Sequence, residues 1–376
     1  MYFLGQAGNF KAKDIWRHTF AFGTVRSLHN LRAHLAKRYQ VAPEQIAFYH
    51  TGRTALATAI KATVPKNSKI AITSLTCYAV VQAVKAANCI PIFVDVNAQT
   101  LHYGAAELKA TLKKYPDIAA VIVQNNLGIP VDITAIKRVA GQRVIIEDLA
   151  HCAGASYPSG QEVGTVGDAT ILSFGKGKSI DTISGGAVIL RNPDLPHPKQ
   201  PIKRPRCSDR LRARFYPLIG ATIRGFYHLK LGRVFTSVML KLHFIQRSAD
   251  APLDFTRRLT YWQAKLALRQ LTNLPKNRPP IREFYLVEHR HRLLKELEYN
   301  GFIMYDIWYD CPVAPERYYK KVNFPNSECP VAVDLAQKLV NLPTHYGRAA
   351  MSPARKIIAK YAITSKIANK GAKNDH

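Results

Sequence analysis

Acidic residues are scarce in this chain of 376 residues, where 25 Asp and Glu stand against 54 Lys and Arg and give a formal net charge of +29. The imbalance is larger in the second half: residues 1–200 carry 22 basic and 12 acidic residues, and residues 201–376 carry 32 and 13. Such a charge indicates anionic partners such as phosphate groups, nucleic acid or acidic lipid, and it does not decide the fold. Because 47% of the residues are hydrophobic, the chain can build a large core and is not a disordered protein.

Cysteine pairs and long apolar runs are also missing. The six cysteines lie singly, without a CxxC pair or a zinc-like spacing, so we expect reduced thiols of a cytoplasmic protein and no metal site. No stretch of 18 uncharged apolar residues is present, which excludes a predicted membrane-spanning helix. The first ten residues show no basic segment followed by an apolar run, so we expect no signal peptide.

Strands and helices are predicted to alternate regularly between about residue 45 and residue 190. Apolar stretches predict strands at residues 69–73, 90–96, 118–123, 144–146, 169–174 and 186–190, and helical patterns lie between them at residues 54–63, 78–87, 105–114 and 133–140. The stretch at 118–123 has almost no alternation, which is typical of a strand buried on both faces. This order predicts an α/β fold with βαβ units and a mostly parallel sheet covered by helices.

The regular alternation ends near residue 191, where a loop rich in proline and basic residues is expected. Residues 255–274 and 281–298 predict two amphipathic helices, and the remainder to about residue 362 could form a small α/β domain. The polar, basic tail at 365–376 predicts disorder. We therefore expect a large domain at 1–250, which contains a basic, apolar insertion at 208–247, and a small C-terminal domain at 251–376.

Three polar features stand at predicted element ends. The first is Thr51-Gly52-Arg53-Thr54, where a glycine and a small hydroxyl residue open a helix. A helix N-terminus presents backbone N–H groups and the positive end of the helix dipole, so it can bind phosphate. The alternative is an ordinary N-cap.

The second feature is Glu147-Asp148 at the end of an apolar strand, with His151 three residues after Asp148. Ligands bind at the carboxyl ends of strands in open α/β sheets. A buried aspartate needs a cationic partner or strong donors, and a protonated pyridine nitrogen would serve. The alternatives are a helix cap for the carboxylates and a structural role for the histidine.

The third feature is the glycine-rich turn Ser173-Phe174-Gly175-Lys176-Gly177-Lys178, which follows a strand. A lysine in such a turn could bind phosphate or act as a Schiff-base amine. The alternative is a pair of solvated loop lysines. A P-loop is excluded, because no GxxxxGK[ST] pattern is present.

The order and spacing of these features resemble the DegT/DnrJ/EryC1/StrS family of aminotransferases. The matching stretches are TGRTAL (51–56), ITSLTCYAVVQAV (72–84), PIFVDV (91–96), VIIEDLAHCAGA (144–155), VGTVGDATILSFGKGKSI (163–180), SGGAVI (184–189) and CPVAVDLAQKLVNLPTH (329–345). The resemblance implies a fold-type-I enzyme that depends on pyridoxal 5′-phosphate. Its large domain would hold a mostly parallel central sheet flanked by helices, and a smaller C-terminal α/β domain would follow.

Roles carry over from the family position by position. Lys178 falls where the family has the catalytic lysine that binds the cofactor as a Schiff base, with Lys176 as the alternative. Asp148 falls where an aspartate pairs with the ring nitrogen. His151 falls where the family has Gln or His near the phenolic oxygen of the ring.

Further positions match the part of the family's site that binds the cofactor phosphate and ring. Ser173, Arg53 and Thr54 fall where the family holds the phosphate, the last two largely through backbone N–H groups. The ring-stacking aromatic residue of the family is replaced here by Cys77, and the next residue, Tyr78, is expected to supply the stack.

The resemblance implies transfer of an amino group, usually from glutamate, to a nucleotide-linked keto-sugar for envelope or surface glycans. It also implies a homodimer with its sites near the interface. The alternatives are a sugar dehydratase and a non-catalytic, membrane-associated relative. A lysine is present at 178, where the dehydratases of the family have histidine, and this favours aminotransfer.

The segment Arg210–Arg247 departs from the family pattern. Eleven Lys and Arg and a single acid, Asp209, lie between Lys203 and Arg247 among many apolar residues. This composition is typical of a helix that lies on a membrane surface, where residues such as Phe226, Leu229, Phe235 and Met239 would enter the lipid. The alternatives are core helices or an interface arm of a dimer. No motif supports nucleic-acid binding, so we expect none.

Overall fold

A seven-stranded sheet forms the centre of the fold in this computed structural model, which describes residues 2–4, 10, 12–229, 231–245, 253–275, 280–304 and 307–363. Its strands are β2 (Ile46–Tyr49), β3 (Lys69–Thr73), β5 (Ile90–Val94), β6 (Ile118–Gln124), β7 (Val144–Asp148), β8 (Ala169–Ser173) and β9 (Gly186–Leu190). They lie in the order β2-β9-β8-β7-β6-β3-β5. The five strands from β8 to β5 are parallel, and β9 is antiparallel to both neighbours. The predicted mostly parallel sheet is thus confirmed.

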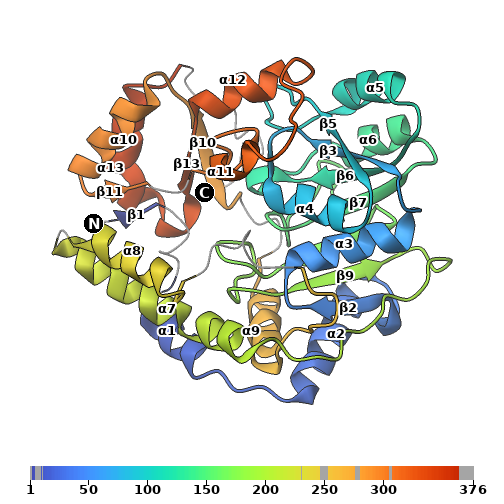
Figure 1. Ribbon diagram of the computed structural model, residues 1–376, viewed down its shortest axis with the longest axis horizontal. Coiled ribbons are helices and arrows are strands. Elements are labelled where there is room, and N and C mark those ends of the chain that lie inside the picture. The colour runs from blue at the N-terminus through green and yellow to red at the C-terminus, as the bar shows by residue number, and fades with distance from the viewer. Residues whose placement is uncertain are drawn as a thin grey trace.

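Helices cover both faces of this sheet (Figure 1). Helices α3 (Gly52–Thr63), α4 (Tyr78–Ala86) and α12 (Pro330–Lys338) contribute to one hydrophobic core, and α2 (Val25–Tyr39), α5 (Ala105–Lys114), α6 (Ile133–Ala140) and α9 (Tyr261–Thr272) to a second. Strand β6 serves both cores: Ala120 and Ile122 belong to the first, and Val121 and Val123 to the second. This confirms the prediction of a strand buried on both faces.

The C-terminal part is built around a two-stranded antiparallel sheet of β10 (Arg282–Leu286) and β13 (Leu339–Pro343). The prediction of one helix over 281–298 is wrong at its start, since α10 spans only Arg290–Tyr299. The physical reason is a two-residue alternation: Phe284 and Leu286 pack against one core, and Tyr285 packs against another. The remaining elements are β11 (Phe302–Ile303), β12 (Val313–Ala314), α11 (Glu316–Tyr319) and α13 (Arg348–Ala359).

Two short strand pairs join this C-terminal part to earlier segments. Strand β1 (Tyr2–Phe3) pairs with β11, and β4 (Thr76–Cys77), which leads into α4, pairs with β12. The beginning of the chain therefore lies against C-terminal elements. The division at residue 250 stays a prediction, and the predicted disordered tail at 365–376 lies outside the described residues.

The basic, apolar segment forms two helices, α7 (Cys207–His228) and α8 (Gly232–Lys241). They pack on each other and α7 packs on α1 (Ala12–Thr19), away from the seven-stranded sheet (Figure 1). The rings of Phe226 and Phe235 stack with centroids 4.1 Å apart, so these two residues hold the helices together rather than pointing outward. Leu229, in contrast, is 67% exposed. None of the described helices has the length and hydropathy needed to cross a membrane.

Candidate active site

One pocket collects most of the predicted site residues at the carboxyl ends of β6, β7 and β8. Its lining includes Gly52, Arg53, Cys77, Gln124, Asn125, Asn126, Asp148, His151, Ser173, Lys178 and Tyr309. Five residues predicted from the sequence thus lie together, namely Arg53, Asp148, His151, Ser173 and Lys178. Because parallel strands end at one edge of the sheet, side chains far apart in the sequence meet there.

The start of α3 faces the end of β8. Thr51 is the N-cap residue, and its hydroxyl accepts a hydrogen bond from the backbone N–H of Thr54 at 3.2 Å. A Cβ atom at Gly52 would lie 2.6 Å from the Ser173 hydroxyl oxygen, so only glycine allows this approach. The positive end of α3 and the Ser173 hydroxyl therefore meet, which is a suitable arrangement for a phosphate group.

The two other residues predicted at the phosphate have further partners. Thr54 does not line the pocket, and its N–H is used by the N-cap. The Arg53 side chain is buried, and its Nη1 donates to Oε1 of Gln82 at 2.6 Å. Thr54 thus takes part in the ordinary N-cap that is the alternative prediction from the sequence. Arg53 lies in the first turn of α3, which faces Ser173.

Asp148 is the last residue of β7 and is buried. The backbone N–H of Ala150 donates to its carboxylate at 2.9 Å. Burial raises the pKa of Asp148, while the Ala150 N–H and the positive charge of Lys178 oppose that shift. A cation placed against the carboxylate would therefore be strongly held.

Glu147, the neighbour of Asp148, has a structural role. It is fully buried and accepts hydrogen bonds from the Tyr157 hydroxyl and from the backbone N–H groups of Gly164, Val166 and Gly167 at 2.5 to 2.7 Å. Successive side chains of a strand point to opposite faces, so Glu147 anchors a loop while Asp148 enters the pocket.

Lys178 and His151 are in direct contact, with Lys178 Nζ 2.7 Å from His151 Nε2. The backbone N–H of Leu127 donates to His151 Nδ1 at 3.2 Å, so Nδ1 is an acceptor. Burial, followed by the positive charges of Lys178 and Arg282, lowers the pKa of His151 well below its usual range. The Lys178 amine, which is a nucleophile once it is deprotonated, is thus held against a neutral imidazole inside the pocket.

Lys176 has a different environment. Its Nζ lies 4.2 Å from the ring centroid of Tyr216 on α7, and it does not line the pocket. Of the two lysines in the turn after β8, Lys178 is therefore the one placed for Schiff-base chemistry.

Tyr78 is not brought into the pocket. Its ring stacks on Tyr318 with centroids 4.6 Å apart and an interplanar angle of 4°, and Cys77 takes the place beside the pocket. The ring-stacking role of Tyr78 stays a prediction without support from this geometry.

Two aromatic residues of the site, Trp308 and Tyr309, are absent from the sequence-based prediction. The Tyr309 hydroxyl donates to Asn126 Oδ1 at 2.8 Å and lies 3.5 Å from His151 Nδ1. The Trp308 ring stacks on His151 at 4.5 Å, and Arg282 lies 4.1 Å from its centroid. Both residues lie between β11 and β12, and no spacing in the sequence connects them to the motifs at 51–190.

A second cleft of about 350 Å³ also includes Lys178 in its lining. Three arginines border this cleft, namely Arg17, Arg269 and Arg282, together with the acidic residues Asp14 and Asp181. A substrate in the cleft would therefore approach the same amine as a cofactor in the pocket.

The residues of the pocket fit pyridoxal 5′-phosphate. Lys178 would hold its aldehyde carbon, Asp148 its ring nitrogen, and Ser173 with the start of α3 its phosphate. A mostly parallel sheet with these groups at its carboxyl edge defines a fold-type-I protein of the pyridoxal-phosphate-dependent class.

The comparisons with known proteins agree with this class. The family model of the DegT/DnrJ/EryC1/StrS aminotransferase family matches residues 33–360. The chain belongs to that family, as its sequence motifs predicted. The pyridoxal-phosphate prediction is confirmed at the level of the family and of its solved structures.

Curated relatives match only part of the chain. The dTDP-4-dehydro-2,3,6-trideoxy-D-glucose 4-aminotransferase of Saccharopolyspora spinosa is 29% identical over 168 residues, which is 44% of this chain and 43% of that protein. The GDP-perosamine synthase of Escherichia coli O157:H7 is 30% identical over 134 residues, which is 35% of this chain and 36% of that protein. The chain thus spans less than half the length of these curated relatives.

Solved structures show the same fold over nearly the whole chain. The Streptococcus pneumoniae protein Spr1654, a sugar aminotransferase by name, is similar in its PMP form with a TM-score of 0.67 and 16% identity, covering 94% of this chain and 98% of that one. The E. coli GDP-4-keto-6-deoxy-D-mannose-3-dehydratase with bound hydrated PLP has a TM-score of 0.62 and 13% identity, covering 95% of this chain and 99% of that one.

Proposed function

We propose that this protein is an aminotransferase that moves an amino group from an amino acid, with glutamate as the expected donor, to a nucleotide-linked keto-sugar. The observation that carries the proposal is the contact between Lys178 Nζ and His151 Nε2 at 2.7 Å in a pocket that also holds Asp148. Such a contact holds an amine in the same pocket as a buried carboxylate, which is the pair of groups that this chemistry requires.

Each residue of the pocket has its own role in the proposed reaction. Bound pyridoxal 5′-phosphate supplies an electron sink for the carbon that gains or loses the amino group. Asp148 keeps the ring nitrogen protonated, because a buried carboxylate needs a cation beside it. Lys178 takes up and returns the proton at the reacting carbon, and its contact with His151 holds the amine in position. Trp308 and Tyr309 fix the His151 ring.

The cleft beyond Lys178 is the proposed substrate side. Its bordering arginines suit the carboxylates of an amino-acid donor and the phosphates of a sugar nucleotide. The names of the curated relatives, one acting on a dTDP-linked sugar and one a GDP-perosamine synthase, support a nucleotide-linked keto-sugar as acceptor. The product would serve envelope or surface glycans.

The proposal is tested by incubating the purified protein with glutamate and a series of nucleotide-linked keto-sugars. Mass spectrometry should find an amino sugar, and 2-oxoglutarate should form in equal amount. The likeness to the E. coli dehydratase defines the alternative outcome, which is a product that has lost a hydroxyl group and carries no nitrogen. The presence of Lys178 favours the amino sugar as the product.

We further propose that the protein works as a cytoplasmic homodimer. The support is a set of exposed apolar side chains on α7, α8 and the segments beside them, which either a second copy or a membrane surface could cover. The basic residues interleaved with them suit the anionic inner face of a membrane. Co-sedimentation with vesicles and analytical ultracentrifugation distinguish the two occupants.

A further inference from the structure

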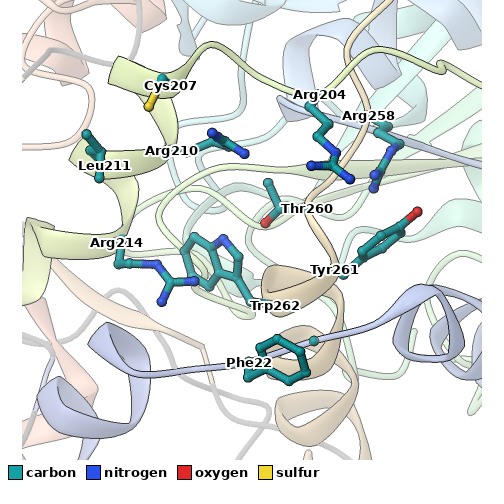
Figure 2. Close-up of a pocket in the computed structure, with 11 residues that line it drawn as sticks. Phe22, Arg204, Cys207, Arg210, Leu211, Arg214, Arg258, Thr260, Tyr261 and Trp262 are labelled. Atoms are coloured by element: carbon teal, nitrogen blue, oxygen red, sulfur yellow. The ribbon is translucent and has the colours of Figure 1, made fainter.

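A separate cavity of about 420 Å³ lies where α7 and α9 begin, beside the loop between α1 and α2 (Figure 2). It shares no lining residue with the cofactor pocket. Four arginines line it, namely Arg204, Arg210, Arg214 and Arg258, and its lining contains no acidic residue. A cavity of this size can hold a small ligand.

The acidic residues nearest in sequence are engaged by other arginines. Asp209 pairs with Arg212 at 3.3 Å, and Asp254 pairs with Arg257 at 2.5 Å. Among the described residues, no carboxylate forms an ion pair with any of the four arginines that line the cavity. Within the described part of the chain no carboxylate compensates their positive charges, and the like charges repel one another.

The surroundings of Arg258 include one of these like charges. Burial lowers the pKa of the Arg258 guanidinium, Tyr261 opposes that shift, and the positive charge of Arg204 adds to it. Figure 2 shows the two guanidinium groups side by side, directed toward the same space. An anion placed there would relieve this repulsion and would be bound by both groups.

Aromatic rings hold two of the guanidinium groups in place. Arg258 lies 3.9 Å from the ring centroid of Tyr261, and Arg214 lies 5.0 Å from that of Trp262. A guanidinium stacked in this way keeps its N–H groups in plane for bidentate hydrogen bonds. Arg214 donates both of its Nη groups to the carbonyls of Thr19 and Ala21 and so is a supporting residue, whereas Arg258 donates its Nη1 to the carbonyl of Leu259 at 3.1 Å.

Arg210 carries an unused donor. Its Nε is buried and donates to no acceptor among the described residues. A buried donor without a partner has lost its hydrogen bonds to water and gained none in return, which is unfavourable. Since Figure 2 shows the Arg210 side chain directed into the cavity, a ligand acceptor is the group that would satisfy it.

Two helix N-termini reinforce the positive potential. Cys207 is the first residue of α7, Tyr261 is the first residue of α9, and both line the cavity. The positive ends of two helix dipoles therefore meet at the place where the arginines gather.

We propose that this cavity binds the phosphate groups of a small phosphate or diphosphate ester, with Arg204, Arg210 and Arg258 as its ligands. Arginine is suited to this chemistry because its planar fork binds phosphate oxygens in pairs. The rim carries Phe22, which is 73% exposed, and Leu211, which is 51% exposed. These side chains can cover the organic group that the phosphate carries.

The site lies outside the cofactor pocket, so it extends beyond the proposed aminotransferase reaction. Two kinds of ligand carry such a phosphate group: a free nucleoside diphosphate and the headgroup of an acidic lipid. Calorimetric titration of the cofactor-loaded protein with inorganic pyrophosphate and with uridine diphosphate tests the first source. Co-sedimentation with vesicles of phosphatidic acid and of phosphatidylcholine tests the second.

The variants are Arg204→Gln and Arg258→Gln, with Arg206→Gln as matched control. Arg206 is exposed, lies between Arg204 and Arg210 in the sequence and does not line the cavity. We expect each of the first two variants to weaken binding of the phosphate probe at least tenfold, and the control to bind as the unchanged protein does. Arg204 is itself exposed, so its replacement leaves folding intact.

Each result of these titrations and co-sedimentations either supports or overturns the proposed phosphate site. Binding of pyrophosphate or uridine diphosphate that both variants weaken supports the site with a free ligand, and selective binding of phosphatidic acid that both weaken supports it with a lipid headgroup. Absence of binding to every phosphate probe, or equal binding by the variants and the control, overturns it. The visible absorbance of bound cofactor and the amino-transfer assay report separately on the cofactor pocket, so failure of one proposal is distinguishable from failure of the other.

Discussion

Two lysines separated by a single glycine give a sharp test of the catalytic assignment at the scale of one residue. We predict that Lys178→Ala abolishes covalent cofactor binding and lowers activity on the order of 1,000-fold or more, because the nucleophilic amine is lost. Lys176→Ala removes the same charge from the same turn and should leave both properties nearly unchanged, since Lys176 lies over Tyr216. Visible absorbance and reduction of the cofactor bond with borohydride are the measurements. The reverse result would place the catalytic lysine two residues earlier.

Asp148 gives the second test at this scale. Asp148→Asn keeps the shape of the side chain and the hydrogen bond from Ala150, but it removes the negative charge that holds the ring nitrogen protonated. We predict that the variant still binds the cofactor through Lys178 and that turnover falls about 100-fold. Single-turnover kinetics with glutamate measure the effect. A near-normal rate would contradict the proposed role of the carboxylate.

The predicted residues that meet in the pocket lie at the end of a strand, at the start of a helix or in the turn that follows a strand. Asp148 and Ser173 end β7 and β8, and the periodicity of these strands marks both positions. Trp308 and Tyr309 reach the site through tertiary packing, by way of the pairing of β4 with β12. No local pattern records such a contact, so these two residues could not be predicted.

Among the helices and strands, α3 approaches the end of β8 closely because Gly52 has no side chain. A Cβ atom at Gly52 would lie 2.6 Å from the Ser173 hydroxyl oxygen and 2.8 Å from its Cβ, both closer than real contacts. We predict that Gly52→Ala moves α3 away from Ser173 and weakens cofactor binding about tenfold or more, because both sides of the phosphate site shift. Equilibrium dialysis of the cofactor measures this.

Gly225 supplies the matched control for this substitution. It lies inside α7, and a Cβ atom there meets nothing within 4 Å. Gly225→Ala should leave cofactor binding unchanged and raise stability by up to about 1 kcal/mol, as expected for alanine in a helix. Equal cofactor affinity in both variants would show that the close approach at Gly52 is unimportant.

Helices and strands can be predicted from the sequence where one hydrophobic periodicity dominates. The βαβ series between β3 and β8 follows from apolar strands buried on both faces and from helices with one apolar side. At 282–286 the charged flanks predict a helix, whereas the alternation of side chains suits the strand that the structure shows. This stretch forms a strand because it pairs with β13, which lies more than 50 residues later in the sequence.

His18 on α1 makes the contact between α1 and α7 sensitive to pH. Its Nε2 lies 2.9 Å from the carbonyl oxygen of Ala213, and its ring packs edge-on against Trp262. Burial lowers the pKa of His18 to about 4. Because the unfolded chain binds a proton at higher pH than the folded one, stability is lost as the pH falls below about 6.5.

This linkage can be measured. Between pH 7 and pH 5 the titration of His18 should remove about 2 kcal/mol of unfolding free energy. His18→Gln keeps an N–H donor and cannot titrate, so its unfolding free energy, measured in urea, should change less between these two pH values than that of the unchanged protein. Equal pH dependence in both proteins would show that His18 becomes protonated without cost in the folded state.

For the whole molecule, charge and exposed apolar surface coincide in one region. The net charge of +29 is concentrated after residue 200, and exposed apolar side chains gather in the same part of the chain. They include Leu218, Leu229, Leu231, Val234 and Leu242, all at least 46% exposed. Large exposed apolar patches mark interaction sites in soluble proteins, and basic residues around such a patch favour an anionic surface.

The last prediction concerns what covers this surface. We predict that the protein co-sediments with anionic vesicles and not with neutral ones, and that high salt releases it, since each basic residue near an anionic surface contributes about 1 kcal/mol. The variant L229S/V234S/L242S should lose this binding, because it removes side chains that would enter the lipid while leaving the stacked pair of Phe226 and Phe235 in place. Ile202→Ser, at a residue 87% exposed and outside both helices, is the control. If the triple variant instead converts a dimer to a monomer in analytical ultracentrifugation, and the unchanged protein ignores vesicles, then the surface is an interface between two copies.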